Sequence, residues 1–126
     1  LGARAVGRED IAAMKETLGD LRRLAAQQDV HEYLRQRWVF HATCYRASGR
    51  QRLVDEVERL FWRADRYNRL VLSTAQRFRE SVRRYQGFLA ACEARDGERA
   101  EAIVQESIRW AFDRAADSVP SEVAAD

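Results

Sequence analysis

The 126-residue sequence predicts an all-α fold, an antiparallel helical bundle of about five to six helices in one domain. Apolar residues recur with a period close to 3.6 over almost the whole chain, as they do on one face of an amphipathic helix. One proline and six glycines leave little material for the turns of a β-sandwich or barrel. No linker interrupts the pattern, so residues 1–126 are predicted to form a single bundle.

The first two long helices are expected over residues 9–28 and from Asp29 to Gly49. Glu9 and Asp10 place negative charge in the first turn, where the helix dipole favours it. Asp29 can cap the second helix, and Gly49 can supply the left-handed residue that often follows a helix end. The apolar stripes consist of Ile11, Met14, Leu18, Leu21 and Ala25 on the first helix, and of Leu34, Trp38, His41 and Tyr45 on the second.

A third helix is expected over residues 50–74, with a break at its last two residues. Ser81 is expected to cap a fourth helix, and Asp96 a fifth that fades towards Pro120, after which the chain should fray. The residues expected to be buried on the third helix are Leu53, Val57, Leu60, Ala64, Tyr67 and Val71. The stripe of the fourth helix consists of Val82 or Ser81 with Tyr85, Phe88, Leu89 and Cys92, and that of the fifth of Ala100, Ile103, Val104, Ser107, Ala111 and Arg114.

Charge and cysteine usage exclude several classes of protein. The formal net charge is +2, with acidic residues interspersed among the 22 basic ones, so the chain lacks the concentrated basic face of a nucleic-acid-binding module. Cys44 and Cys92 lie in apolar helical stretches without zinc-site spacing, and we expect buried thiols in a reducing cytoplasm. No apolar run approaches the roughly 18 residues of a membrane span. Because Leu1 is not a methionine, we expect a fragment or a processed chain.

Motifs for catalysis are missing from the sequence. It contains no glycine-rich phosphate loop, no HExxH and no nucleophile elbow. The two histidines, His31 and His41, are too few for most zinc sites. We therefore expect that the protein is not an enzyme.

Four polar residues lie on apolar helix faces. Arg37 and His41 are one turn apart on the second helix, while Tyr85 and Ser107 lie on the inward stripes of the fourth and fifth. Buried polar groups require partners, so four that converge would indicate a cavity that holds a polar ligand or ordered water. A helical bundle can equally hold such residues as ordinary hydrogen-bonded core residues, and periodicity alone leaves both interpretations open.

Several segments, taken in order, resemble a known family. The matching segments are Phe40-His41, Ala47-Ser48-Gly49-Arg50 with Leu53 after it, Ser81, Phe88-Leu89-Ala90-Ala91, Asp96 and Ala100. With them, nearly the whole chain resembles the FadR-type C-terminal ligand-sensing domain (FCD) of the GntR superfamily of bacterial transcription regulators. The family has a Ser-x-x-Glu capping box where this chain has Ser81-x-x-Arg84, so that helix start would lose its reciprocal cap.

The resemblance also identifies a difference at the family's metal site. Many members hold a metal in the bundle interior with one Asp and three His, and the matching positions here are Arg37, His41, Tyr85 and Ser107. Only His41 keeps the family's residue. One imidazole with a phenol and a hydroxyl would not hold zinc tightly, so we expect no bound metal and no other cofactor.

For function, the resemblance implies an effector-binding and dimerisation domain, with DNA bound by a winged-helix domain outside this chain. We expect a small anionic effector, a carboxylate, held bidentately by Arg37 with hydrogen bonds from His41, Tyr85 and Ser107. A buried arginine needs either that ligand or a carboxylate partner such as Asp65. The alternative is a helical dimerisation module whose pocket has degenerated and holds no ligand. Either protein would be a cytoplasmic homodimer without a membrane partner.

Overall fold

The computed structural model describes residues 2–118 and confirms the all-α prediction. The described residues form seven helices and no strand. The helices are α1 (Gly2–Ala5), α2 (Arg8–Gln27), α3 (Val30–Arg46), α4 (Gln51–Arg63), α5 (Asp65–Val71), α6 (Ala75–Glu93) and α7 (Gly97–Ser118). The four-residue α1 was not predicted, and the helix expected over residues 50–74 is divided at Ala64 into α4 and α5. The predicted fading towards Pro120 lies outside the described residues.

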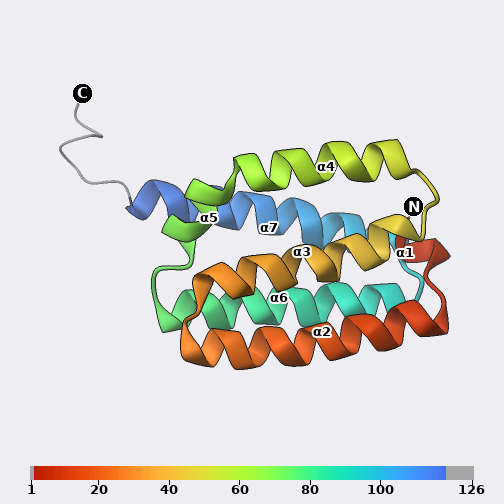
Figure 1. Cartoon of the computed structure of the whole chain (residues 1–126), viewed down its shortest axis with the longest axis horizontal. Helices are drawn as coiled ribbons and strands as arrows, with labels where there is room; N and C mark the ends of the chain where they lie inside the picture. Colours follow the sequence, from red (N-terminus) through yellow and green to blue (C-terminus); the bar gives the residue numbers. More distant parts are fainter. Residues whose placement is uncertain (1, 119–126) are drawn as a thin grey trace.

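The long helices run antiparallel along one axis (Figure 1). Helices α2, α4 and α7 run in one direction, and α3 and α6 run in the other. Helix α2 packs against α3 and α6, and α7 packs against α6 and α5. Helix α1 covers one end of the bundle, where it contacts α3, α6 and α7, and α5 lies at the opposite end. None of the described helices is both long enough and apolar enough to cross a membrane.

Side-chain caps mark three helix starts. The Asp29 carboxylate accepts from the Glu32 amide at 3.3 Å and the Asp96 carboxylate from the Arg99 amide at 3.1 Å, which confirms both predicted caps. The prediction for Ser81 is wrong, because α6 begins six residues earlier, where the Thr74 hydroxyl accepts from the Arg77 amide at 3.2 Å. Ser81 lies inside α6, so the expected loss of a capping box at this residue is also wrong.

Two helices end in left-handed residues that are not glycine. Gln28 after α2 has φ 53° and Arg95 after α6 has φ 54°. In each case the following amide donates to a carbonyl five residues earlier, from Asp29 to Leu24 and from Asp96 to Ala91. These bonds are those of a Schellman motif, which usually places glycine at the left-handed position. Gly49 does adopt the predicted left-handed conformation, with φ 74°, although α3 itself ends three residues earlier.

The main core lies among α2, α3 and α6. Its largest fully buried side chains include Tyr33, Phe40, Phe78, Met14, Leu21 and Leu34. Tyr33 packs edge-on against Phe78, and its hydroxyl shares a 2.7 Å hydrogen bond with that of Ser81. Cys44 and Cys92 are buried free thiols, as predicted, with their sulfurs 3.8 Å apart. Side chains of α3 and α6 meet across this core, and both helices supply residues to the site described below.

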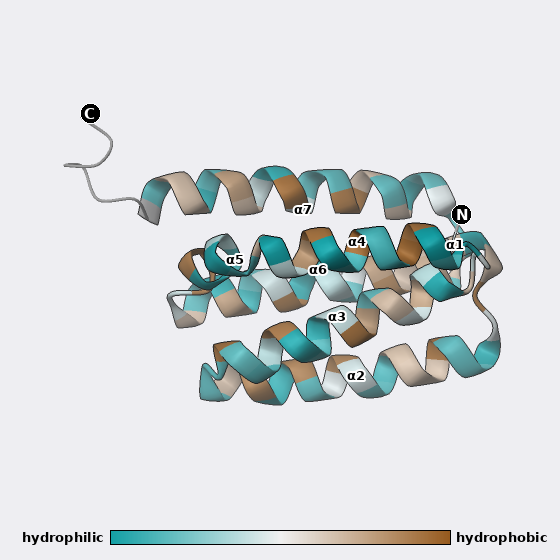
Figure 2. Cartoon of the chain, turned by 45° about the horizontal axis from the view of Figure 1, so that its top comes forward, coloured by the Kyte–Doolittle hydropathy of each residue, from teal (hydrophilic) through white to brown (hydrophobic). Residues whose placement is uncertain are grey.

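Helix α4 packs loosely, contrary to prediction. Leu53, Leu60 and Tyr67 were expected to be buried, yet they are 53%, 61% and 64% exposed. The physical reason is that α4 has only α3 and α5 as substantial neighbours, so of its own residues only Val54 is fully buried. Apolar and polar residues alternate along α4 (Figure 2), and Leu53 and Leu60 of its apolar stripe are left uncovered by neighbouring helices. Val71 is buried as predicted, and Val57 and Ala64 are partly buried.

Candidate functional site

The structure brings Arg37, His41, Tyr85 and Ser107 together around one cavity of about 210 Å³. Arg37 and His41 come from α3, Tyr85 from α6 and Ser107 from α7. Helices α4 and α5 contribute further lining residues, so five helices meet at this point. The other side chains that matter for its chemistry are Trp38, Tyr45, Phe61, Asn68, Arg84 and Trp110.

Arg37 is the cationic residue from α3 in this cavity. Its guanidinium carbon lies 4.8 Å from the centre of the Phe61 ring, so an aromatic face covers one side of the group. Its Nε is buried and has no hydrogen-bond partner in the structure. The suggested carboxylate partner, Asp65, does not fill this role, because it accepts instead from Arg69 at 2.8 Å. Among the described residues no acidic side chain pairs with Arg37, so the cavity contains a positive charge without an internal counter-charge.

His41 lies one turn away among aromatic rings. It stacks on Tyr45 with ring centres 5.6 Å apart and meets the edge of Tyr85 at 5.1 Å. Burial, with the positive charge of Arg37 as a second cause, lowers the pKa of His41 to about 3. The imidazole is therefore neutral near pH 7 and can act as one donor and one acceptor. Its Nδ1 lies 3.4 Å from the Tyr45 hydroxyl, which leaves Nε2 for another partner.

Tyr85 supplies a neutral hydroxyl. Burial raises the pKa of its phenol, while the charge of Arg37 and the hydroxyl of Ser81 act in the opposite direction. The ring packs against Phe40 with centres 5.4 Å apart, which holds it in place. Ser107 is partly buried on α7 and adds a second hydroxyl at the cavity wall. The site thus combines two arginines, Arg37 of α3 and Arg84 of α6, with neutral hydrogen-bonding groups.

This donor set does not fit a tightly held metal ion. Zinc in proteins is held by His, Cys, Asp or Glu, and of these the described wall offers a single imidazole, beside four hydroxyls and one amide. The phenol would have to lose its proton to become a strong ligand, and its raised pKa opposes that. The guanidinium of Arg37 would also repel a cation. The part of the chain that the structure describes contains no cluster of three or more such metal ligands elsewhere.

Sequence reasoning missed three residues at this site. Asn68 reaches the cavity because the chain turns at Ala64 and starts α5, a break that no proline or glycine marks. Arg84 lies over the ring of Trp110, with its guanidinium carbon 5.0 Å from the ring centre. The indole of Trp110 donates to Glu80 at 2.8 Å. These contacts join α6 to α7 at the rim, and only the packing of the two helices brings them together.

The comparison with protein families agrees with the resemblance noted in the sequence. The model of the FCD domain matches residues 1–109. The chain belongs to the FCD domain family. FCD domains are the C-terminal effector-binding, regulatory domains of GntR-family regulators, and such regulators are not enzymes. Neither the curated proteins nor the solved structures gave a match.

Proposed function

We propose that this FCD domain binds a small carboxylate effector in the cavity around Arg37, without a bound metal. The observation that carries the proposal is the buried Nε of Arg37, which lacks a hydrogen-bond partner. A buried guanidinium N–H that lacks a hydrogen-bond acceptor is costly, by about 1–3 kcal/mol in the general case. A carboxylate would satisfy the guanidinium with two parallel hydrogen bonds, a geometry that lysine cannot supply.

The other side chains are suited to the rest of such a ligand. Neutral His41 and the hydroxyls of Tyr85 and Ser107 can each donate to an oxygen of the effector. Because these three groups are neutral, they leave the positive charge of Arg37 free to attract the carboxylate of the effector. Because these residues come from α3, α6 and α7, a bound effector would link three helices and favour one arrangement of the bundle.

We expect the domain to regulate DNA binding through this preference for one arrangement of the bundle. A winged-helix domain would bind DNA, and the effector would change the spacing of two such domains in a cytoplasmic homodimer. The FCD domain itself would catalyse no reaction. Coupling between the effector and DNA is reciprocal, so each should alter the affinity of the other by the same factor.

Calorimetric titration with acetate, succinate, citrate, benzoate and octanoate tests the anchor. We expect Arg37→Gln to weaken every carboxylate that binds by about 10-fold or more, the order of a charge-assisted hydrogen bond. Arg35→Gln is the matched control, because Arg35 lies on the same helix but is exposed and paired with Glu32. Equal affinities in the wild type and Arg37→Gln, or no binding by any of the five, would overturn the proposal.

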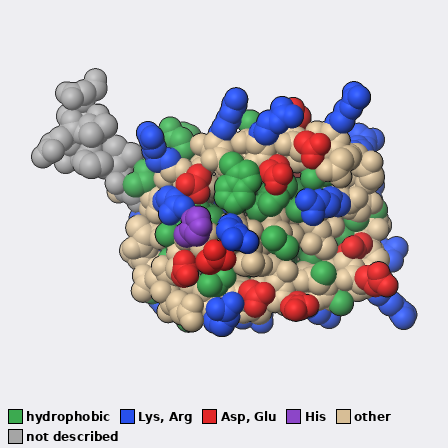
Figure 3. Space-filling view, viewed as in Figure 1, with side chains coloured by type: hydrophobic (Ala, Val, Ile, Leu, Met, Phe, Trp, Pro, Cys, Tyr) green, Lys and Arg blue, Asp and Glu red, His purple; other side chains and the backbone are tan. Residues whose placement is uncertain are grey.

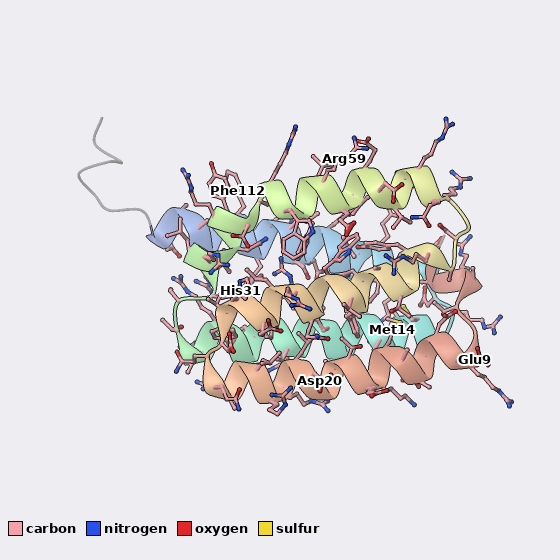
Figure 4. All side chains as sticks on the ribbon, viewed as in Figure 1. Glu9, Met14, Asp20, His31, Arg59 and Phe112 are labelled. Carbon is pink, nitrogen blue, oxygen red and sulfur yellow. The ribbon has the colours of Figure 1, made fainter. Side chains whose placement is uncertain are left out.

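Dimerisation has separate support in exposed apolar side chains at one end of the bundle. Leu60 on α4, Tyr67 on α5 and Phe112 on α7 are 61%, 64% and 77% exposed. Phe112 lies on α7 (Figure 4), and α7 packs against α5 at this end of the bundle. Large apolar residues at such exposure are typical of association surfaces. We therefore propose that a second copy of the chain covers these three residues.

Sedimentation velocity tests this surface. We expect the wild type to sediment as a dimer, and Phe112→Glu to shift it to monomer at micromolar concentration because the substitution buries a charge at the interface. Val39→Glu is the control, since Val39 is an exposed apolar residue of α3 outside the proposed surface. A monomeric wild type, or a dimer that Phe112→Glu leaves intact, would contradict the assignment.

A further inference from the structure

A second hollow adjoins the cavity and extends it between α4 and α7. This groove measures about 520 Å³ and is lined at its far end by Gly2 and Ala3 of α1. The cavity and the groove share five lining residues: Tyr45, Val57, Phe88, Val104 and Ile108. The two hollows therefore adjoin at these residues, and a ligand that starts at Arg37 and passes them would enter the groove.

The groove differs from the cavity in its chemistry. Beyond the shared residues, its wall is formed mainly by Leu53, Val54, Cys44, Ala100, Gly2 and Ala3. No arginine or lysine lines it among the described residues, and its one charged side chain is Glu101. An anionic group would thus be repelled from the groove, while an apolar chain would find partners along its length.

The loose packing of α4 explains how the groove arises. Leu53 of α4 and Ile108 of α7 both line it and are 53% and 66% exposed, because neither helix covers the other closely there. On the face drawn in Figure 3, hydrophobic side chains gather in the region of α4 and α3 with charged ones around them. The exposed stripe on α4 is therefore divided between this groove, at Leu53, and the proposed dimer surface, at Leu60.

From the adjacency of the two hollows and their different chemistry we infer that the effector is amphipathic: a monocarboxylate whose head binds Arg37 and whose apolar tail lies in the groove. The inference rests on the proposed function, because it takes Arg37 as the anchor of the head group. Ligand pockets usually measure roughly 300–1,000 Å³. The cavity alone, at about 210 Å³, is below that range, and the adjoining groove of about 520 Å³ brings the site into it.

The same arrangement selects against other acids. The second carboxylate of a dicarboxylate such as succinate would enter the groove beside Glu101 and lose its hydration without gaining a cation. A short acid such as acetate would fill the cavity but leave the groove to water. Affinity should therefore grow with the length of the apolar tail.

A chain-length series measures this directly by calorimetry, with butyrate, hexanoate and octanoate as the probes. We expect the dissociation constant to fall roughly 2- to 4-fold for each added methylene, the order set by the burial of one CH₂ group. Octanol, which has the tail without the charge, should bind at least 10-fold more weakly than octanoate, as expected when a charge-assisted hydrogen bond is lost.

A pair of variants assigns the tail to the groove. Leu53→Ser should weaken octanoate about 3-fold or more, because an apolar contact is lost, and should change butyrate less than 2-fold. Val39→Ser is the control, since Val39 is an exposed apolar residue of α3 that lines neither hollow and lies outside the proposed dimer surface. Circular dichroism confirms that each variant keeps its helix content.

The outcomes separate this inference from the proposed function. Equal affinities across the three chain lengths, together with a loss of binding in Arg37→Gln, would overturn the tail assignment and leave the carboxylate anchor standing. The tail assignment also fails if Leu53→Ser and Val39→Ser behave alike. Octanol that binds as tightly as octanoate would overturn the anchor, and the inference with it.

Discussion

The neutral imidazole of His41 links the site to the stability of the fold. Burial and the charge of Arg37 lower its pKa from 6.5 to about 3, so the folded chain binds a proton less readily than the unfolded chain. Stability should therefore rise with pH between about 3 and 6.5 and be lost as the pH falls through this window. Because His41 is only partly buried, we expect this one residue to contribute about 1 kcal/mol of the loss between pH 7 and pH 5.

Urea unfolding at these two pH values measures the contribution. His41→Gln should lose less stability on acidification than the wild type does, by that amount. His31→Gln, which removes the exposed imidazole at the start of α3, is the control. An acid sensitivity that is the same with and without His41 would show that the imidazole is not held in its neutral form by the fold.

The buried hydrogen bond between Tyr33 and Ser81 gives a second test at the scale of single residues. Its oxygens are 2.7 Å apart and join α3 to α6 within the core. Tyr33→Phe should destabilise the fold by about 1 kcal/mol, and Ser81→Ala by a similar amount. In a double-mutant cycle by urea unfolding, the two changes together should cost clearly less than their sum. Additive costs would show that the hydroxyls do not stabilise each other.

The sequence could predict which residues reach the cavity where the periodicity of a single helix determines which side chains face inward. Arg37 and His41 lie one turn apart on the stripe of α3, and their inward position follows from periodicity. The pairing of Asp65 could not be predicted, because its choice of Arg69 over Arg37 depends on how α5 starts after Ala64. Serine is a common helix-capping residue, but the hydroxyl of Ser81 shares a hydrogen bond with that of Tyr33 in the core instead.

At the scale of helices, the two left-handed residues Gln28 and Arg95 are sites where the chain can be stabilised. A non-glycine residue in this conformation costs roughly 1–2 kcal/mol, which glycine avoids at some entropic cost in the unfolded chain. Gln28→Gly and Arg95→Gly should each stabilise the protein by about 0.5–1 kcal/mol. Gln27→Gly, one residue earlier and inside α2, should instead destabilise it by about 1 kcal/mol. Thermal or urea unfolding measures the stability of the three variants, and a Gln28→Gly variant less stable than the wild type would contradict this prediction.

Helix α4 shows what an amphipathic pattern leaves open. The spacing of Leu53, Val57 and Leu60 does identify one apolar face. It does not say whether a neighbouring helix, a ligand or a second chain covers that face, and in this bundle α3 reaches only part of it. Of the other long helices, α2, α3 and α7 begin where the sequence predicted, whereas α6 begins six residues before Ser81. The groove between α4 and α7 could not be predicted, because the apolar pattern does not say which helices leave this face uncovered.

For the whole molecule, effector binding should appear as added stability. A ligand that binds only the folded chain stabilises it by about 2.7 kcal/mol when present at 100 times its dissociation constant. Octanoate should therefore raise the urea midpoint of the wild type, and Arg37→Gln should lose most of this gain. Arg35→Gln, whose exposed side chain pairs with Glu32, should keep it. A gain that is equal in all three proteins would show that octanoate acts away from Arg37.

The most direct measurement is a crystal structure of the protein with octanoate. We expect the carboxylate within hydrogen-bond distance of the Arg37 guanidinium and the alkyl chain between α4 and α7, against Leu53 and Ile108. A cavity closed by its own side chains, with the carboxylate elsewhere on the protein, would contradict this and favour a dimerisation module that has lost its ligand.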